Sequence, residues 1–371
     1  TTWFFETFLL SSHLEGYRAF DEKYAELFNS YYEGIGSRHP RAERGNLSRP
    51  TLDEVHEYRR YVDVAMEMLL DSVHGSGDEI VSRTVLGLNH EQQHQELIVT
   101  DLKFILGHNP LRPAYQLGDD DDHSSPRPQT YVPVTGGLVM IGAEANDPFC
   151  FDNETPKHRV WVDDFEFAER LVTNEEYLAF IEDDGYRTPS LWLSDGWREV
   201  NERDWKAPEY WTQRDSTWHE YTLAGESQLI PNVPVTHISF YEADAFARWY
   251  GARLATEFEW EHAADQARDR LESTESRGFH PRSARGKGVR QLLDECWQWT
   301  MSSYAPYPGF RPLSGTLGEY NGKFMANQMV LRGGSCASPQ GHVRHTYRNF
   351  FYAKDRWQFT GIRLVKNGSK L

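Results

Sequence analysis

The segment at residues 86–98, LGLNHEQQHQELI, constrains the fold of this chain more than any other stretch. Read as an α-helix with about 100° of rotation per residue, it places His90 and His94 about 40° apart on one face. Leu86, Leu97 and Ile98 share that row, which predicts that the face points into a protein interior. Two buried imidazoles are costly unless something pairs with both. The spacing therefore predicts either a shared metal ion or two rings satisfied by neighbouring helices.

Helical patterns surround this segment and predict an antiparallel helical bundle with short connections. Residues 2–10 and 21–33 are helical in tendency. Thr51 and Glu54 form a capping box in front of an amphipathic run that continues to Val73. A Gly-Ser-Gly turn at residues 75–77 leads into the histidine helix, which we expect to end near Leu106. Residues 108–130 are rich in Pro, Asp, Ser and Gly, so we expect the domain boundary there.

Beyond residue 130 the chain has frequent glycines, clustered tryptophans and short apolar runs, which predict short strands and loops. Helices are expected only at residues 173–181 and 239–249. The fold class is therefore α+β. We expect a helical domain at residues 1–115, a linker at 116–130 and a second domain at 131–371. The chain opens on Thr1 without an initiator Met, and we expect residues upstream of it to be missing.

Composition disfavours several classes of function. A net charge of -17 makes the chain a poor non-specific partner for nucleic acid or an anionic membrane. No apolar run approaches the roughly 18 residues that cross a bilayer. Cys150, Cys296 and Cys336 are far apart and form no Cys-x-x-Cys pair, which favours a reducing cytoplasm over a disulfide framework or thiolate zinc site. We interpret Cys336 as a buried structural cysteine.

The central motif matches H-E-x-x-H through His90, Glu91 and His94, the pattern of zinc hydrolases in which the glutamate is the general base. No recognisable zincin pattern marks a third ligand downstream. Three neutral imidazoles with open positions would also suit a non-haem ferrous site, although two histidines and a carboxylate are the commoner set. The motif alone leaves both alternatives open.

Other constellations point to a small-molecule site. Arg38, Arg41 and Arg44 share one loop, where guanidinium groups could clamp a carboxylate or simply face solvent. Tyr31 and Tyr32 precede that loop, and a phenol near a metal can protonate a bound oxygen species; ordinary core packing is the alternative. A third candidate is the segment Asn349-Phe350-Phe351, in which a polar amide precedes two aromatic residues. These side chains could hold a ligand, or they could pack as ordinary core residues.

Several ordered motifs resemble the iron-dependent sulfoxide synthases of ergothioneine biosynthesis. The helical half matches through TTWFFETF at residues 1–8, FNSYY at 28–32 and NHEQQHQE at 89–96. The second half matches through GLVMIG at 137–142, FDNE at 151–154, VTN at 172–174, PVTHIS at 234–239, RLATEFEWE at 253–261, WQWT at 297–300, LRGGS at 331–335 and GIRL at 361–364. The resemblance implies a DinB-like four-helix bundle followed by a C-type-lectin-like domain of the formylglycine-generating-enzyme type.

This resemblance also implies the chemistry. The family joins a thiol to hercynine, using Fe(II) and O2, and oxidises the sulfur to a sulfoxide. By resemblance, His90 and His94 are two iron ligands, and a third histidine is expected just upstream of Thr1. Gln93 would face hercynine. The betaine end would be held by Asn349 and Phe350.

By the same resemblance, Arg41 and Arg44 would bind the carboxylate of the thiol, and Tyr31 or Tyr32 would supply the active-site phenol, with Tyr304 and Tyr307 as alternatives. Some members use Asp and a following arginine to hold the glutamyl part of γ-glutamylcysteine. Phe351 and Asp355 depart from that pattern, although Arg356 is close in sequence, so we expect free cysteine as the thiol.

Three other functions remain as alternatives at this point. A close relative could make selenoneine or ovothiol, although no methyltransferase sequence accompanies this chain as in most ovothiol enzymes. A zinc hydrolase would use the H-E-x-x-H motif and be indifferent to oxygen. A lectin-like binding protein without enzymatic activity would consume no oxygen with any thiol.

Overall fold

The computed structural model describes residues 1–30, 32–73, 79–118, 126–144, 147–267 and 278–368, and of residues 41 and 42 only the backbone. The chain divides into two compact units. The first unit comprises Thr1–His94 and Arg311–Lys323, and the second comprises Gln95–Phe310 and Phe324–Leu371. The predicted domain limits at residues 115 and 131 stay a prediction.

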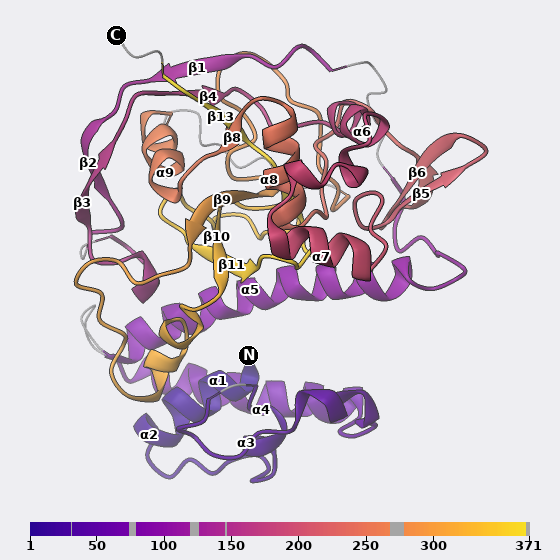
Figure 1. Ribbon diagram of the computed structural model, residues 1–371. Coiled ribbons are helices and arrows are strands. Elements are labelled where there is room, and N and C mark those ends of the chain that lie inside the picture. The colour runs from indigo at the N-terminus through magenta and orange to yellow at the C-terminus, as the bar shows by residue number, and fades with distance from the viewer. Residues whose placement is uncertain (31, 74–78, 119–125, 145–146, 268–277, 369–371) are drawn as a thin grey trace. The chain divides into compact units, whose positions relative to one another are not determined.

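The first unit is helical (Figure 1). Its N-terminal stretch is helical from Thr2 to His13, as α1 (Thr2–Phe5), a π-helical turn (Glu6–Leu10) and α2 (Ser11–His13). After these come α3 (Tyr24–Leu27), a 3-10 helix (Arg41–Asn46), α4 (Leu52–Asp71) and the first half of α5 (Glu79–Gly107). A 3-10 helix at Gly315–Glu319 completes the unit. The predicted helical character of this region is confirmed, whereas its DinB-like four-helix arrangement stays a prediction.

The capping box at the start of α4 is confirmed. The Thr51 hydroxyl accepts a hydrogen bond from Glu54 N, and the Glu54 carboxylate accepts one from Thr51 N. Tyr58, Val62 and Leu69 then recur at helical spacing and are buried. Capping and the apolar stripe together explain why the amphipathic run at 52–71 forms a long helix.

The long helix expected over residues 21–33 is wrong, because the structure forms only the short α3 there. The Asn29 side chain explains the early end. Its Oδ1 accepts from Tyr32 N, and its Nδ2 donates to Tyr32 O, each at 2.9 Å. An asparagine that bonds backbone groups three residues on offers the chain an alternative to helical hydrogen bonds.

A buried carboxylate links the N-terminal helical stretch to α4. Glu6 accepts hydrogen bonds from the Tyr17 hydroxyl at 2.7 Å and the Tyr58 hydroxyl at 2.6 Å. It also accepts one from Phe20 N at 3.0 Å. Three hydrogen bonds to one buried side chain tie Tyr17, Phe20 and Tyr58 together, so this cluster fixes the aromatic side of the unit.

The second unit contains the strands (Figure 1). One four-stranded sheet has the order β1-β4-β13-β8 and another has the order β11-β10-β9-β12; a pair β2-β3 and a three-stranded sheet β5-β6-β7 accompany them. Their bounds are β1 Tyr131–Val134, β2 Gly137–Ile141, β3 His158–Val162, β4 Phe165–Ala168, β5 Trp211–Arg214, β6 Thr217–Thr222, β7 Gly225–Gln228, β8 Arg253–Leu254, β9 Trp297–Ser303, β10 Gln328–Arg332, β11 Asn349–Tyr352, β12 Thr360–Gly361 and β13 Leu364–Asn367.

Helices α6 (Asn174–Glu182), α7 (Ser194–Glu202), α8 (Phe240–Trp249) and α9 (Glu257–Gln266) belong to this unit, and α8 and α9 pack against β9. The helices predicted at 173–181 and 239–249 are thus confirmed within one residue at each end, whereas the expectation of no other helix in this half is wrong, because α7 and α9 also form. Short 3-10 turns lie at Asp152–Glu154, Gly185–Arg187, Pro189–Leu191 and Gly322–Phe324. The α+β class is confirmed.

An ionic cluster lies inside the second unit. Arg332 is fully buried on β10 and pairs with Glu257 and Glu261, each at 2.9 Å. Arg348 pairs with Glu257 at 2.8 Å. Buried charges are tolerated only when paired in this way, so the cluster sets which strands and helices can meet here. Across the described part of the chain, no helix combines the length and apolar character needed to cross a membrane.

Candidate functional site

The two histidines of the central motif face each other on α5. Their Nε2 atoms are 3.0 Å apart, and the ring planes are nearly perpendicular at 82°. His90 is buried, with 8% of its surface exposed. The predicted pairing of the two rings on one helical face is therefore confirmed as geometry.

Both imidazoles are neutral at physiological pH. Burial lowers the pKa of His94 to about 4. Burial, and after it the charge of His94, lowers the pKa of His90 well below its ordinary value. A neutral imidazole keeps a lone pair on one ring nitrogen, which is the state that binds a metal ion.

The pair fits two positions of a metal site. Two ligand nitrogens about 2.1 Å from one ion and at right angles to each other would be about 3.0 Å apart. The observed 3.0 Å between the Nε2 atoms agrees with that value. His90 Nδ1 is buried and has no hydrogen-bond partner among the described residues. Among the same residues no group of three His, Cys, Asp or Glu side chains could hold a metal ion, so the histidine pair has no third candidate ligand there.

A cavity of about 270 Å³ opens beside the two rings. Most of its wall is aromatic or apolar, and the two imidazoles are among its few polar groups. It is lined by Thr1, Thr2, Trp3, Phe4, Phe28, Ser30, Tyr32, Val55, Tyr58, His90 and His94.

Tyr32 is buried in the wall of this cavity. Its ring stacks on Trp3 with a centroid separation of 5.6 Å, and Asn29 holds its backbone from both sides. This anchoring fixes the ring relative to His90 and His94. The neighbouring candidate, Tyr31, lies outside the described residues.

Tyr320 is a second phenol near the histidines, and the sequence alone did not suggest it. Its ring centroid lies 5.6 Å from that of His90, and its hydroxyl donates a hydrogen bond to Gln93 Oε1. Glu319, the preceding residue, accepts hydrogen bonds from Glu33 N and Gly34 N at 3.1 and 2.9 Å. Tyr320 and Gln93 are 227 residues apart, so no spacing pattern could have connected them.

The hydrogen bond from the Tyr320 hydroxyl to Gln93 Oε1 orients the Gln93 side-chain amide. The structure therefore groups His90, His94, Gln93, Tyr32 and Tyr320 within the first unit.

The glutamate of the H-E-x-x-H motif is engaged elsewhere. Glu91 pairs with Arg59 of α4 at 3.4 Å, and Arg59 also pairs with Asp63 at 2.8 Å. The Glu91 carboxylate is thus bound by a guanidinium of a neighbouring helix, which engages the group that a zinc hydrolase would use on a metal-bound water. This arrangement disfavours the zinc-hydrolase interpretation.

The arginine loop is partly described. Arg44 lies in the 3-10 helix Arg41–Asn46 and donates to Ser30 O at 3.4 Å, and Ser30 lines the histidine cavity. Arg41 begins the same helix, but its side chain lies outside the described part of the structure. Arg38 pairs with Glu33 at 3.0 Å, and both side chains are largely exposed.

Asn349 and Phe350 belong to the second unit, at the start of β11. Asn349 Oδ1 accepts a hydrogen bond from Phe350 N, and the Phe350 ring stacks on Tyr304 at 4.1 Å and 11°. Tyr304 accepts from Asn153, and Tyr307 bonds with Arg332 and Glu257 in the ionic cluster. Of the two alternative phenols, Tyr304 therefore packs beside Phe350, and Tyr307 belongs to the core.

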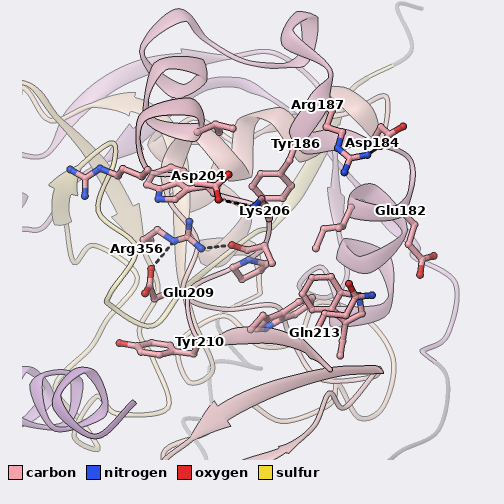
Figure 2. Close-up of a pocket in the computed structure, with 18 of the residues that line it drawn as sticks. Glu182, Asp184, Tyr186, Arg187, Asp204, Lys206, Glu209, Tyr210, Gln213 and Arg356 are labelled. Atoms are coloured by element: carbon pink, nitrogen blue, oxygen red, sulfur yellow. Dashed lines mark hydrogen bonds and ion pairs between the residues drawn. The ribbon is translucent and has the colours of Figure 1, made fainter. Parts of the chain in front are cut away.

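Arg356 is buried, and its guanidinium is paired with carboxylates of the second unit. Figure 2 shows its guanidinium between Glu209 and the chain near Lys206, at the wall of a cavity of about 1010 Å³. It pairs with Glu209 at 3.1 Å and Glu242 at 3.3 Å, and it stacks on Trp205 at 4.6 Å. Phe351 packs its ring edge against Trp357 at 5.3 Å.

Comparisons with known proteins extend over both units. A family described as the sulfatase-modifying factor enzyme 1-like domain matches residues 119–287 and 265–368, as expected for the second half. The chain is 32% identical over 360 residues to a hercynine oxygenase of Mycolicibacterium smegmatis, covering 88% of this chain and 81% of that protein. A hercynine oxygenase of Mycobacterium tuberculosis is 33% identical over 352 residues, with the same coverage of 88% and 81%. Ergothioneine biosynthesis protein 1 of Schizosaccharomyces pombe is 28% identical over 232 residues, covering 59% of this chain and 28% of that protein.

Proposed function

Because this chain belongs to the hercynine oxygenase family of ergothioneine-biosynthesis sulfoxide synthases, we propose that it joins a thiol to hercynine with Fe(II) and O2. The observation that carries the proposal is the 3.0 Å separation of the His90 and His94 Nε2 atoms beside a cavity. Both rings are neutral when buried, as iron ligands must be. The third histidine expected before Thr1 stays a prediction.

Bound iron would supply the redox chemistry and would favour the thiolate form of a coordinated thiol. The residues of this chain bind and orient the substrates. Gln93, whose Oε1 accepts a hydrogen bond from the Tyr320 hydroxyl, is proposed by resemblance to face hercynine. Arg41 and Arg44 are the proposed clamp for the thiol carboxylate. Asn349 and Phe350 are proposed, by resemblance, to hold the betaine end.

The phenol is proposed to deliver a proton near the two histidines, and so to steer the reaction away from simple oxidation of the thiol to a sulfinate. Two described tyrosines support this role. Tyr32 lines the cavity that His90 and His94 share. Tyr320 contacts the His90 ring and bonds to Gln93.

Free cysteine is the proposed thiol. The occupied state of Arg356 supports this choice, because a guanidinium paired with Glu209 and Glu242 is already neutralised. Phe351, packed on Trp357, offers no charge to a glutamyl group. The glutamyl part of γ-glutamylcysteine carries a carboxylate and an ammonium group, which would have no evident partners at these two positions.

The direct test is an oxygen electrode combined with mass spectrometry. The protein would be loaded with Fe(II) without air, then mixed with hercynine and either cysteine or γ-glutamylcysteine. We expect O2 uptake and a hercynyl-cysteine sulfoxide, with the higher kcat/KM for cysteine. No O2 uptake with either thiol would overturn the proposed reaction, whereas a higher kcat/KM for γ-glutamylcysteine would overturn only the thiol assignment.

The ligand assignment has a matched control. His94→Ala should abolish tight binding of Fe(II), measured by anaerobic competition with a chromogenic chelator. His56→Ala should leave that binding unchanged, because His56 is an exposed residue of α4. Equal Fe(II) affinity in the two variants would reject His94 as a ligand.

The phenol assignment is tested by product ratios. Tyr32→Phe and Tyr320→Phe are each compared with Tyr61→Phe, whose hydroxyl bonds to Arg18 O at an exposed position. We expect one of the two cavity variants to shift product from sulfoxide toward cysteine sulfinate. An unchanged ratio in both variants would remove these two tyrosines from the chemistry.

A further inference from the structure

A basic cavity of about 670 Å³ lies in the second unit, apart from the residues discussed above. Five cationic side chains line it against one carboxylate, that of Glu169. The cations are Arg127, Arg170, Arg285, Lys287 and Arg290. This local excess contrasts with the net charge of -17 for the whole chain. A hollow lined by one sign of charge concentrates ligands of the opposite sign.

Part of this cavity wall is rigid. Arg170 is buried and forms two hydrogen bonds of 2.8 Å with the Glu176 carboxylate. Arg290 is tied to the loop next to it, because its Nε donates to Arg285 O at 3.1 Å and its backbone N donates to Glu169 O at 2.7 Å. These two arginines are therefore positioned before any ligand arrives, which reduces the entropy lost on binding.

The loop at residues 283–290, SARGKGVR, forms the other side of the cavity. Gly286 and Gly288 have φ values of +84° and +77°, which favour glycine. A Cβ on Gly286 would lie 3.2 Å from Arg290 Nη2, so the end of the Arg290 side chain packs closely over this glycine. Left-handed residues within a short loop can turn backbone N–H groups toward an anion.

Two cations of this loop are not neutralised within the described structure. Arg285 and Lys287 are exposed, and neither side chain has an ion pair among the residues that the structure describes. Glu169, the single carboxylate of the wall, already accepts a hydrogen bond from the Thr130 hydroxyl at 2.6 Å. The cavity thus combines a positioned Arg290 with the adjustable charges of Arg285 and Lys287, whereas the charge of Arg170 is compensated by Glu176.

We propose that this cavity binds a small, multiply charged anion bearing phosphate groups, at a site separate from the proposed iron chemistry. Guanidinium forks match phosphate oxygens in pairs, and a lysine adds a point charge. The volume lies in the usual range for metabolite-sized ligands. A long nucleic acid is disfavoured, because the rest of the chain is strongly acidic.

The test is isothermal titration calorimetry of the iron-free full chain with inorganic phosphate, pyrophosphate and ATP in separate titrations. Neither hercynine nor activity is needed, so the result is independent of the proposed reaction. We expect one site per chain, with pyrophosphate or ATP bound more tightly than phosphate and with affinity falling as NaCl is raised. A preference for ATP over pyrophosphate would assign a nucleotide, and the reverse would assign the phosphate groups alone.

Two double variants decide whether this cavity is the site. Arg285→Gln with Lys287→Gln should weaken binding by about tenfold or more, since two charge contacts are lost. Arg159→Gln with Lys354→Gln removes the same charge from exposed positions outside the cavity and should leave affinity unchanged. Equal affinity in both variants, absence of saturable binding, or binding of a DNA oligonucleotide but not of pyrophosphate would overturn the proposal.

Discussion

Replacing Glu96 by Met should destabilise the second unit strongly. The Glu96 carboxylate, on α5, accepts hydrogen bonds from Trp297 Nε1 at 2.7 Å, from the Ser335 hydroxyl at 2.7 Å and from the Ser338 hydroxyl at 2.6 Å. Trp297 and Ser335 are buried. Methionine has a similar length but no acceptor, so all three donors would lose their partner.

The expected loss in the free energy of unfolding follows from the number of buried donors left without an acceptor. A buried donor without a partner costs about 1–3 kcal/mol. The hydroxyls of Ser335 and Ser338 are 3.5 Å apart and can partly satisfy each other, whereas the Trp297 indole cannot turn away. We therefore expect Glu96→Met to lower the free energy of unfolding by about 3–5 kcal/mol. Glu96→Gln, which keeps one acceptor oxygen, should cost about 1 kcal/mol.

Urea unfolding followed by tryptophan fluorescence is a suitable assay for the second unit. That unit holds 11 of the 12 tryptophans, and Trp3 alone belongs to the first unit. The control is Glu199→Met on α7, which removes an ion pair with the largely exposed Arg203 that follows this helix. That change should cost less than about 1 kcal/mol. If Glu96→Met were no more destabilising than the control, the importance assigned to the three hydrogen bonds would be refuted.

Three further changes test other parts of the fold. Burial raises the pKa of Glu295 from 4.5 to about 8. The contribution of Glu295 to the free energy of unfolding is therefore complete below pH 4.5 and is lost as the pH rises toward 8. Glu295→Gln should reduce this decrease in the free energy of unfolding, measured by urea titrations at several pH values. Gly87→Ala should cost about 1–3 kcal/mol by thermal unfolding, because the added Cβ would lie 2.6 Å from the Phe5 ring. Tyr58→Phe removes a donor to the buried Glu6 and should cost about 1–3 kcal/mol, measured by loss of helical circular dichroism.

Periodicity and capping predicted much of the helical structure, because both depend on residues close in sequence. Thr51 with Glu54 marked the start of α4, and the four-residue spacing of His90 and His94 placed both rings on one face of α5. The same local reasoning failed over residues 21–33, where the Asn29 side chain competes with the helix for backbone hydrogen bonds.

Long-range features could not be predicted from spacing. Tyr320 reaches Gln93 across 227 residues, and its importance depends entirely on tertiary structure. Arg356 is close in sequence to the Asn349 motif, but only the structure reveals that Glu209 and Glu242 already pair with it. Resemblance to a family supplied a candidate role for Arg356 but none for Tyr320, whereas the residue pattern itself supplied the histidine pair, the arginine loop, the Tyr31-Tyr32 pair and the Asn349 motif as candidates.

Residues 311–323 belong to the first unit although they are far from the rest of it in sequence, which matters for protein engineering. A fragment that ends at residue 115 would keep both histidines of α5 but would lack Tyr320 and the Glu319 carboxylate that holds the backbone at Gly34. Such a fragment would carry the two proposed metal ligands without one of the two phenols. Swapping the helical half between homologues therefore requires transplanting this distant peptide together with it.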